Sequence, residues 1–176
     1  KSTLAYAVAP SIGAVPGALV VRSDEVRKRL SGVTPLTRLG AAAYSSDATR
    51  RVYETLIQRA ATIVHAGHSV IVDAVFAQSA DRDALERVAK AERVPFVGLW
   101  LDAPERVLAD RLQRRRFDPS DADADVVRAQ VAVGAGGVRW PRIPASGTKE
   151  DVLRRVMSAI VASTAESRLL VAAGSR

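Results

Sequence analysis

The stretch GHSVIVDAVF, residues 67–76, decides the fold class that we expect for this chain. Three β-branched residues, Val70 to Val72, form a continuous apolar run that ends at an acid, Asp73. A short run of this kind is typical of a strand buried on both faces, as the strands of a parallel sheet are. In an open α/β sheet, ligands bind at the carboxyl ends of the strands, so Asp73 is a candidate ligand-binding residue.

Strand-like and helix-like segments alternate on both sides of this stretch. Further strands are expected over residues 18–21 and 95–101 and around residue 143, and helices over residues 25–30, 46–66, 80–92, 105–116, 126–133 and 150–162. The chain opens on a helix, because Leu4, Val8 and Ile12 recur every four residues. This alternation predicts βαβ units, and hence an α/β domain with a parallel sheet.

The composition fits one ordinary domain and excludes several classes of protein. A chain of 176 residues can bury a sizeable core, and the lack of cysteine excludes a disulfide scaffold and a thiolate metal site. No run approaches the roughly 18 apolar residues of a membrane helix, so no membrane span is expected, and a cytoplasmic location fits this composition. Arginine supplies most of the basic residues behind the net charge of +7. This suggests either anionic partners, such as phosphates or nucleic acid, or an ordinary surface of mixed charge.

The first three residues, Lys1, Ser2 and Thr3, are the leading candidates for phosphate binding. A phosphate-binding loop has the form GxxxxGK followed by Ser or Thr, with a strand before it and a helix after it. Its lysine neutralises the outer phosphates, and its hydroxyl ligates Mg²⁺. Only the last positions of this motif are present, so the alternative is a lysine and a serine at a frayed end. The chain begins on Lys1 rather than methionine, which suggests that it is cut from a longer protein.

Two acids follow predicted strands and are therefore expected at the same edge of the sheet. Asp73 would position Mg²⁺ or its waters, or else cap the turn that follows it. Asp24 would orient or deprotonate an attacking hydroxyl, or else act as a plain helix N-cap. Arg22, Arg27 and Arg29 flank Asp24 and could hold an anionic substrate. Of these, Arg27 lies one helical turn from Asp24.

A second group of arginines precedes an acidic stretch, DPSDADAD, at residues 118–125. Its members are Arg106, Arg111, Arg114, Arg115 and Arg116. Arg111 and Arg115 share one helix face, and Arg114 lies one turn from Arg111. Such a group can form a lid that stabilises the charge of a phosphoryl group during transfer. The alternative is a solvated helix whose arginines pair with nearby acids.

Six segments in a fixed order carry a resemblance to a known family. They are VRSDEVRKRL (21–30), GVTPLTRL (32–39), the segment 44–53, GHSVIVDAVF (67–76), VPFVGLWLDAP (94–104) and SDADADVVRAQ (120–130). Over roughly residues 1–160 the chain resembles the small bacterial P-loop kinase-like domains related to gluconate kinase, shikimate kinase, the zeta-toxin group and polynucleotide kinase. It especially resembles the version fused behind an aminoglycoside-phosphotransferase-like domain.

The resemblance implies a three-layer P-loop NTPase fold, with a five-stranded parallel sheet in the nucleotide-kinase order, and ATP and Mg²⁺ as cofactors. Lys1 would contact the β- and γ-phosphates. Ser2 would bind Mg²⁺ with Thr3 nearby, and Asp73 would lie by the metal.

The same resemblance implies three further parts of the site. Asp24 would face the acceptor. The lid would consist of Arg111, Arg114 and Arg115. The loop that passes beside the adenine would include Ser146 and Gly147.

The chain departs from this family at its start, because the glycines before Lys1 and the strand that feeds them are absent there. In this fold that strand is central, between the strands at Val70 and Phe96. Its absence would leave two unpaired ladders in the core. We therefore expect a truncated P-loop domain over residues 1–162, a C-terminal tail or helix extension over residues 163–176, and poor folding and ATP binding of the chain as it stands.

The function expected from these features is ATP-dependent transfer of the γ-phosphate to a small hydroxylated acceptor. Two alternatives use the same phosphate cradle. One is a polynucleotide 5′-hydroxyl kinase, whose binding to single strands would fall steeply with salt. The other is a non-catalytic, nucleotide-binding regulatory module of a larger bifunctional protein, which would bind ATP without turning over any acceptor.

Overall fold

The computed structural model describes residues 1–113, 137–163 and 170–175. The strands are β1 (Leu19–Arg22), β2 (Val70–Asp73), β3 (Phe96–Asp102), β4 (Arg142–Pro144) and β5 (Leu170–Ser175). The α-helices are α1 (Ser2–Val8), α2 (Ser23–Leu30), α3 (Ser46–His65), α4 (Ser79–Glu92), α5 (Glu105–Gln113) and α7 (Lys149–Ser163), with single 3₁₀ turns η1 (Ala9–Ser11) and η2 (Ala41–Tyr44). The expected α/β class is confirmed, and the helix expected over residues 126–133 lies outside the described residues.

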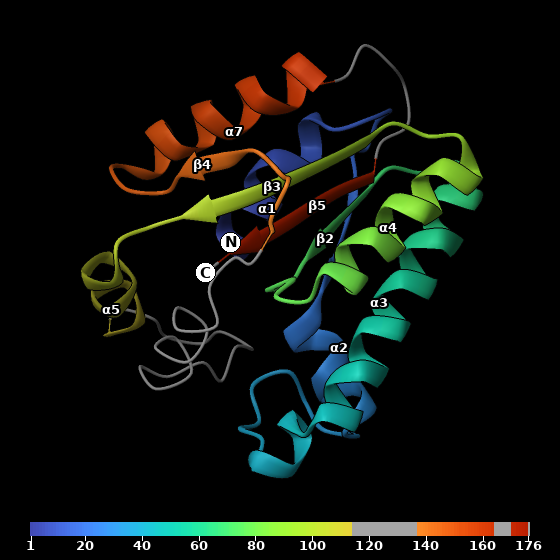
Figure 1. The fold of residues 1–176 in the computed structure, drawn as a ribbon, viewed down its shortest axis with the longest axis vertical. Helices are drawn as coiled ribbons and strands as arrows, with labels where there is room; N and C mark the ends of the chain where they lie inside the picture. Colours follow the sequence, from blue (N-terminus) through green and yellow to red (C-terminus); the bar gives the residue numbers. More distant parts are fainter. Residues whose placement is uncertain (114–136, 164–169, 176) are drawn as a thin grey trace.

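The five strands form one sheet in the order β1-β2-β5-β3-β4, and every pairing in it is parallel. Strand β5, dark red in Figure 1, runs between β2 and β3. Its first residue, Leu170, lies opposite Val70 on one side and Phe96 on the other. The five-stranded parallel sheet expected from the sequence is therefore confirmed. Its central strand lies between β2 and β3, the two strands that were expected to border it.

Two expectations about the ends of the chain are wrong. The central strand is not missing, because residues 170–175 occupy its place, and these residues are consequently not a tail or a helix extension. The physical reason is the backbone of β2 and β3, whose facing edges need hydrogen-bond partners. The run LVAAGS supplies those partners with small and apolar side chains that fit between two layers of helices.

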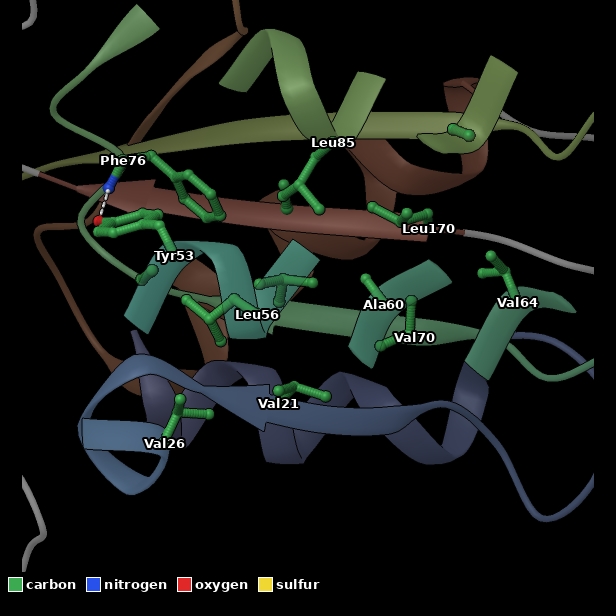
Figure 2. Packing of buried hydrophobic residues seen from close by; sticks show 14 of the residues in the cluster. Val21, Val26, Tyr53, Leu56, Ala60, Val64, Val70, Phe76, Leu85 and Leu170 are labelled. Atoms are coloured by element: carbon green, nitrogen blue, oxygen red, sulfur yellow. Dashed lines mark hydrogen bonds between the residues drawn. The ribbon is translucent and has the colours of Figure 1, made fainter. Parts of the chain in front are cut away.

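The two faces of the sheet are covered by different helices, because successive side chains of a strand point to opposite faces. Val70 and Val72 of β2 belong to the core on the side of α3 and α4. Ile71 belongs to the core on the side of α1 and α7. Figure 1 shows these helices on either side of the strands, which gives three layers. Figure 2 shows side chains of α3, such as Leu56 and Ala60, pointing toward the sheet.

Two glycines leave room for large aromatic side chains over the middle of the sheet. A Cβ at Gly98 of β3 would lie 2.4 Å from atoms of the Trp140 ring. A Cβ at Gly174 of β5 would lie 2.8 Å from the ring of Trp100. Both tryptophans are buried, so the strands and rings fix each other's positions. Among the helices of the described residues, none combines the length and the apolar character that a membrane span requires.

Candidate functional site

Some of the polar residues that the sequence singled out lie together at the carboxyl ends of the parallel strands. Arg22 ends β1 and Asp73 ends β2, and the register places these two residues side by side. Asp73 also lies opposite Ala173 of β5. Helix α1 begins at this edge, because Ser2 contacts Asp73. The two ends of the chain therefore come close together at this edge, as the labels N and C show in Figure 1.

Asp73 is the centre of the candidate site. Its side chain is only 2% exposed, and its Oδ2 accepts a hydrogen bond from the Ser2 hydroxyl at 2.5 Å. The ammonium of Lys1 lies 3.8 Å from Oδ1. That Oδ1 atom is buried and has no hydrogen-bond partner within the described residues. The structure thus brings together Lys1, Ser2 and Asp73, while Thr3 is an exposed residue in the first turn of α1.

Arg22 is a member of this site whose position the sequence did not indicate. It is 5% exposed, and its Nε lies 3.6 Å from Asp73 Oδ2. Its Nη1 donates to Glu25 Oε1 at 3.2 Å, and the same carboxylate oxygen accepts from the Tyr6 hydroxyl at 3.1 Å. From the sequence, Arg22 is expected only as one of three arginines near Asp24 that could hold an anionic substrate. The signal that could have placed it on Asp73 is that both residues end strands that become neighbours in the sheet.

Asp24 lies in the first turn of α2, two residues after Arg22 in the sequence, and it is half-buried. It is not the N-cap of α2, because the helix begins at Ser23 and its N-cap is Arg22, so Asp24 is the second residue of the helix. The negative charge of Asp24 contributes to the electrostatic environment of Tyr53, a buried residue of α3. The Tyr53 hydroxyl accepts a hydrogen bond from the Phe76 backbone amide at 2.9 Å. Burial raises the pKa of Tyr53 to about 12, with the carboxylates of Asp81 and Asp24 adding to the rise. Figure 2 shows the Tyr53–Phe76 hydrogen bond as a dashed line.

Arg27 is turned toward the protein rather than toward the sheet edge. It is 8% exposed, and its Nη1 donates to the carbonyl of Ala43 at 2.6 Å and to the Thr49 hydroxyl at 3.3 Å. Its guanidinium also lies over the ring of Tyr44, 4.7 Å from the centroid. These contacts attach α2 to η2 and the start of α3. Substrate binding by Arg27 stays a prediction.

The loop expected beside the adenine connects β4 to α7. Arg155 of α7 donates through Nη1 to the carbonyls of Pro144 and Ser146, at 2.9 and 3.0 Å. Gly147 follows with a φ of +96°, a conformation that favours glycine. Helix α7 packs against α1, so this loop belongs to the side of the sheet where the phosphate candidates begin their helix.

The expected arginine lid falls mostly on residues that the structure does not describe. Arg111 lies in the last turn of α5. Arg114 and Arg115 lie outside the described residues, as does the acidic stretch after them. The lid therefore stays a prediction.

Comparison with known proteins identifies the family. A family model described as an AAA domain matches residues 1–135, which include α1, β1, β2 and the Lys1–Ser2–Asp73 group. The chain belongs to this family.

This AAA domain is 32% identical over 154 residues to uncharacterized proteins of Mycobacterium tuberculosis (strain H37Rv) and Mycobacterium bovis. The match covers 85% of this chain and 30% of each relative, so the chain spans about a third of the length of these relatives. Fusion to an aminoglycoside-phosphotransferase-like domain stays a prediction.

Among solved structures, the AAA domain is similar to a gluconokinase from Sinorhizobium meliloti 1021, with a TM-score of 0.62 and 18% sequence identity. The match covers 92% of this chain and 85% of the gluconokinase. At that level of identity the likeness concerns the fold. The expected P-loop kinase-like fold is confirmed by this match together with the sheet order.

Proposed function

We propose that this AAA domain binds ATP with Mg²⁺ and transfers the γ-phosphate to a small hydroxylated acceptor. The observation that carries the proposal is the group at the sheet edge, where an ammonium, a hydroxyl and a buried carboxylate meet. These are the three side chains that a phosphate-binding loop and the acid at the end of the neighbouring strand bring to a nucleotide. The nucleotide-binding part of the proposal has the stronger support, because the family and the fold both agree with it.

The residues present fit Mg²⁺. A serine hydroxyl and a carboxylate oxygen are hard oxygen donors, and Mg²⁺ usually takes only one or two protein ligands besides water and substrate phosphates. The buried Asp73 Oδ1, which has no hydrogen-bond partner among the residues that the structure describes, suits a role in holding the ion or a water bound to it. In the described parts of the chain, no three His, Asp or Glu side chains gather into a metal cluster, which also favours a site completed by the nucleotide. When bound, the ion would neutralise negative charge on the phosphates.

The chain's own residues would divide the reaction as follows. The Lys1 ammonium would neutralise and orient the outer phosphates. Asp24 would accept the proton of the acceptor hydroxyl while the hydroxyl oxygen forms a bond to the γ-phosphorus and the bond from that phosphorus to the β-phosphate oxygen breaks, so that ADP leaves. The predicted lid of Arg111, Arg114 and Arg115 would stabilise charge on the transferred group, and the loop at Ser146 and Gly147 would border the base.

The experiment that tests this proposal compares Asp24→Asn with wild type in binding and in transfer. Binding of ATP is measured by calorimetry, and transfer is measured with labelled ATP against a panel of sugars, sugar acids and nucleosides. We expect Asp24→Asn to bind ATP normally and to lose transfer by at least about 100-fold, because general base catalysis contributes at that level. Asp47→Asn, the same change at an exposed acid in the first turn of α3, is the matched control and should leave both unchanged.

Two other results would change the assignment. Unchanged transfer by Asp24→Asn would remove Asp24 from the reaction. Tight ATP binding with no transfer to any acceptor would favour the regulatory module instead. That alternative gains support from the 30% coverage of the longer relatives, which leaves room for a separate catalytic part.

A further inference from the structure

Arg22 joins the phosphate side of the site to the acceptor side through two carboxylates. On one side its Nε lies 3.6 Å from Asp73 Oδ2, and on the other its Nη1 lies 3.2 Å from Glu25 Oε1. Glu25 follows Asp24 in the first turn of α2, and it also accepts a hydrogen bond from Tyr6 of α1. One buried guanidinium therefore contacts the carboxylate at the end of β2 and the helix that carries the proposed base.

Nucleotide binding would affect the contacts of Asp73 with Lys1 and Ser2 differently from its contact with Arg22. In the structure described here, Lys1 and Ser2 both contact Asp73. Under the proposed function, the Lys1 ammonium turns to the phosphates and the Ser2 hydroxyl turns to the ion, so both contacts with Asp73 weaken. Arg22 belongs to β1 rather than to α1, and nothing in the proposed reaction requires it to leave Asp73.

We propose that Arg22 is a positioning residue, which holds the Asp73 carboxylate in the orientation that Mg²⁺ needs once Lys1 and Ser2 have turned to the nucleotide. This inference rests on the proposed function. A group that contacts a metal-binding side chain and fixes its orientation commonly raises metal affinity by a factor of about ten or more. The role assigned to Arg22 is of that kind, because it touches the carboxylate and not the nucleotide.

A purely electrostatic role for Arg22 would have the opposite sign. A positive charge beside a metal-binding carboxylate repels a divalent ion, so its removal would strengthen Mg²⁺ binding. The Glu25 carboxylate, 3.2 Å from the guanidinium, offsets much of that charge. We therefore expect orientation to outweigh repulsion, and the two explanations are separated by the direction in which Mg²⁺ affinity changes.

The test measures the Mg²⁺ concentration that half-saturates binding of a fluorescent ATP analogue, and the affinity of the same analogue without Mg²⁺. Arg22→Met removes the charge and the donors, and Arg22→Lys keeps the charge but cannot reach two carboxylates with a planar fork. We expect Arg22→Met to raise the Mg²⁺ requirement by roughly tenfold, Arg22→Lys to raise it less, and binding without Mg²⁺ to stay unchanged. The matched control is Arg50→Met, at an exposed ion pair on α3, which should behave as wild type.

A further variant keeps the test decisive if Arg22→Met fails to fold. Glu25 is more exposed than Arg22, so Glu25→Gln preserves the fold while it releases the far end of the guanidinium. It should raise the Mg²⁺ requirement by roughly two- to threefold. An unchanged or lower requirement in both Arg22→Lys and Glu25→Gln overturns the role of Arg22 and leaves the proposed function intact. If wild type shows no Mg²⁺-dependent binding of the analogue, the proposed function fails first, and the role of Arg22 falls with it.

Discussion

Substitution of Gly174 by alanine tests whether residues 170–175 are the central strand. Gly174 lies opposite Trp100 in the β5–β3 pairing, and a Cβ added to it would lie 2.8 and 3.0 Å from two atoms of the Trp100 ring and 3.4 Å from the ring of Trp140. Ordinary contacts between such atoms are 3.5–4.0 Å, so the ring or the strand has to move by roughly 0.5–1 Å. Trp100 is 1% exposed and cannot move without displacing its neighbours.

The expected cost follows from that overlap. Adding a methyl group to a well-packed core costs about 1–3 kcal/mol of unfolding free energy. For a domain of this size, each kcal/mol lowers the melting temperature by roughly 2–4 °C, so a fall of about 2–12 °C is expected in thermal unfolding followed by circular dichroism. The matched control is Gly40→Ala, because a Cβ at Gly40 meets nothing within 4 Å and its φ of −76° suits alanine.

A second substitution identifies the neighbour that causes the cost. Trp100→Leu removes the ring that the new Cβ would strike, so the double variant should be more stable than the sum of the two single effects predicts, by about 1 kcal/mol or more. If Gly174→Ala has the same melting temperature as wild type and Gly40→Ala, β5 does not pack between β2 and β3, and the inference that residues 170–175 form the central strand is refuted.

Two other predictions concern the site and its surroundings. Asp73→Asn should abolish Mg²⁺-dependent ATP binding, and unaltered Mg²⁺-dependent binding would contradict the metal role. The same variant should lower the unfolding free energy by less than the roughly 3–5 kcal/mol typical of a broken buried ion pair, because Glu25 still pairs with Arg22. For Tyr53, the folded-state pKa of about 12 lies above its ordinary value of 10.0, so the neutral phenol contributes stability that is full below pH 10 and is lost as the pH rises from 10 toward 12. The melting temperature of Tyr53→Phe should therefore fall less steeply than that of wild type over this interval, and equal slopes would show that another group titrates there.

Local sequence patterns were sufficient to predict most of the helices and strands and part of the candidate site. The run Val70 to Asp73 is a strand with the bounds that its β-branched residues indicate. The positions of Asp73 and Ser2 also follow from local signals, because an acid that ends a buried strand and a hydroxyl that opens a helix both belong at the carboxyl edge of a parallel sheet. Each of these inferences needs only the residue and its immediate neighbours.

The two features that were missed depend on pairing between distant segments. Leu170 lies between Val70 and Phe96, and a short apolar run at residues 170–175 carries no local signal for which strands it joins. The contact of Arg22 with Asp73 likewise arises only from the β1–β2 register. Sequence separation is what hides both features, since the residues that decide them are about 50 to 100 positions apart.

Part of the arginine excess has a structural role, because several arginines donate hydrogen bonds to backbone carbonyls. Two buried arginines donate to backbone carbonyls outside the helices that carry them: Arg27 to Ala43 in η2, and Arg82 to Phe76 and Ala77 in the loop after β2. Arg155, which is exposed, donates in the same way from α7 to the carbonyl of Ser146. A guanidinium has five donors in a rigid plane and can hold two carbonyls at once, whereas a lysine presents a single point charge, so these positions favour arginine over lysine. Arg27 and Arg82 are buried and use their donors within the protein, so these two side chains are not available for direct contact with a nucleic-acid backbone, and part of the +7 has a structural role.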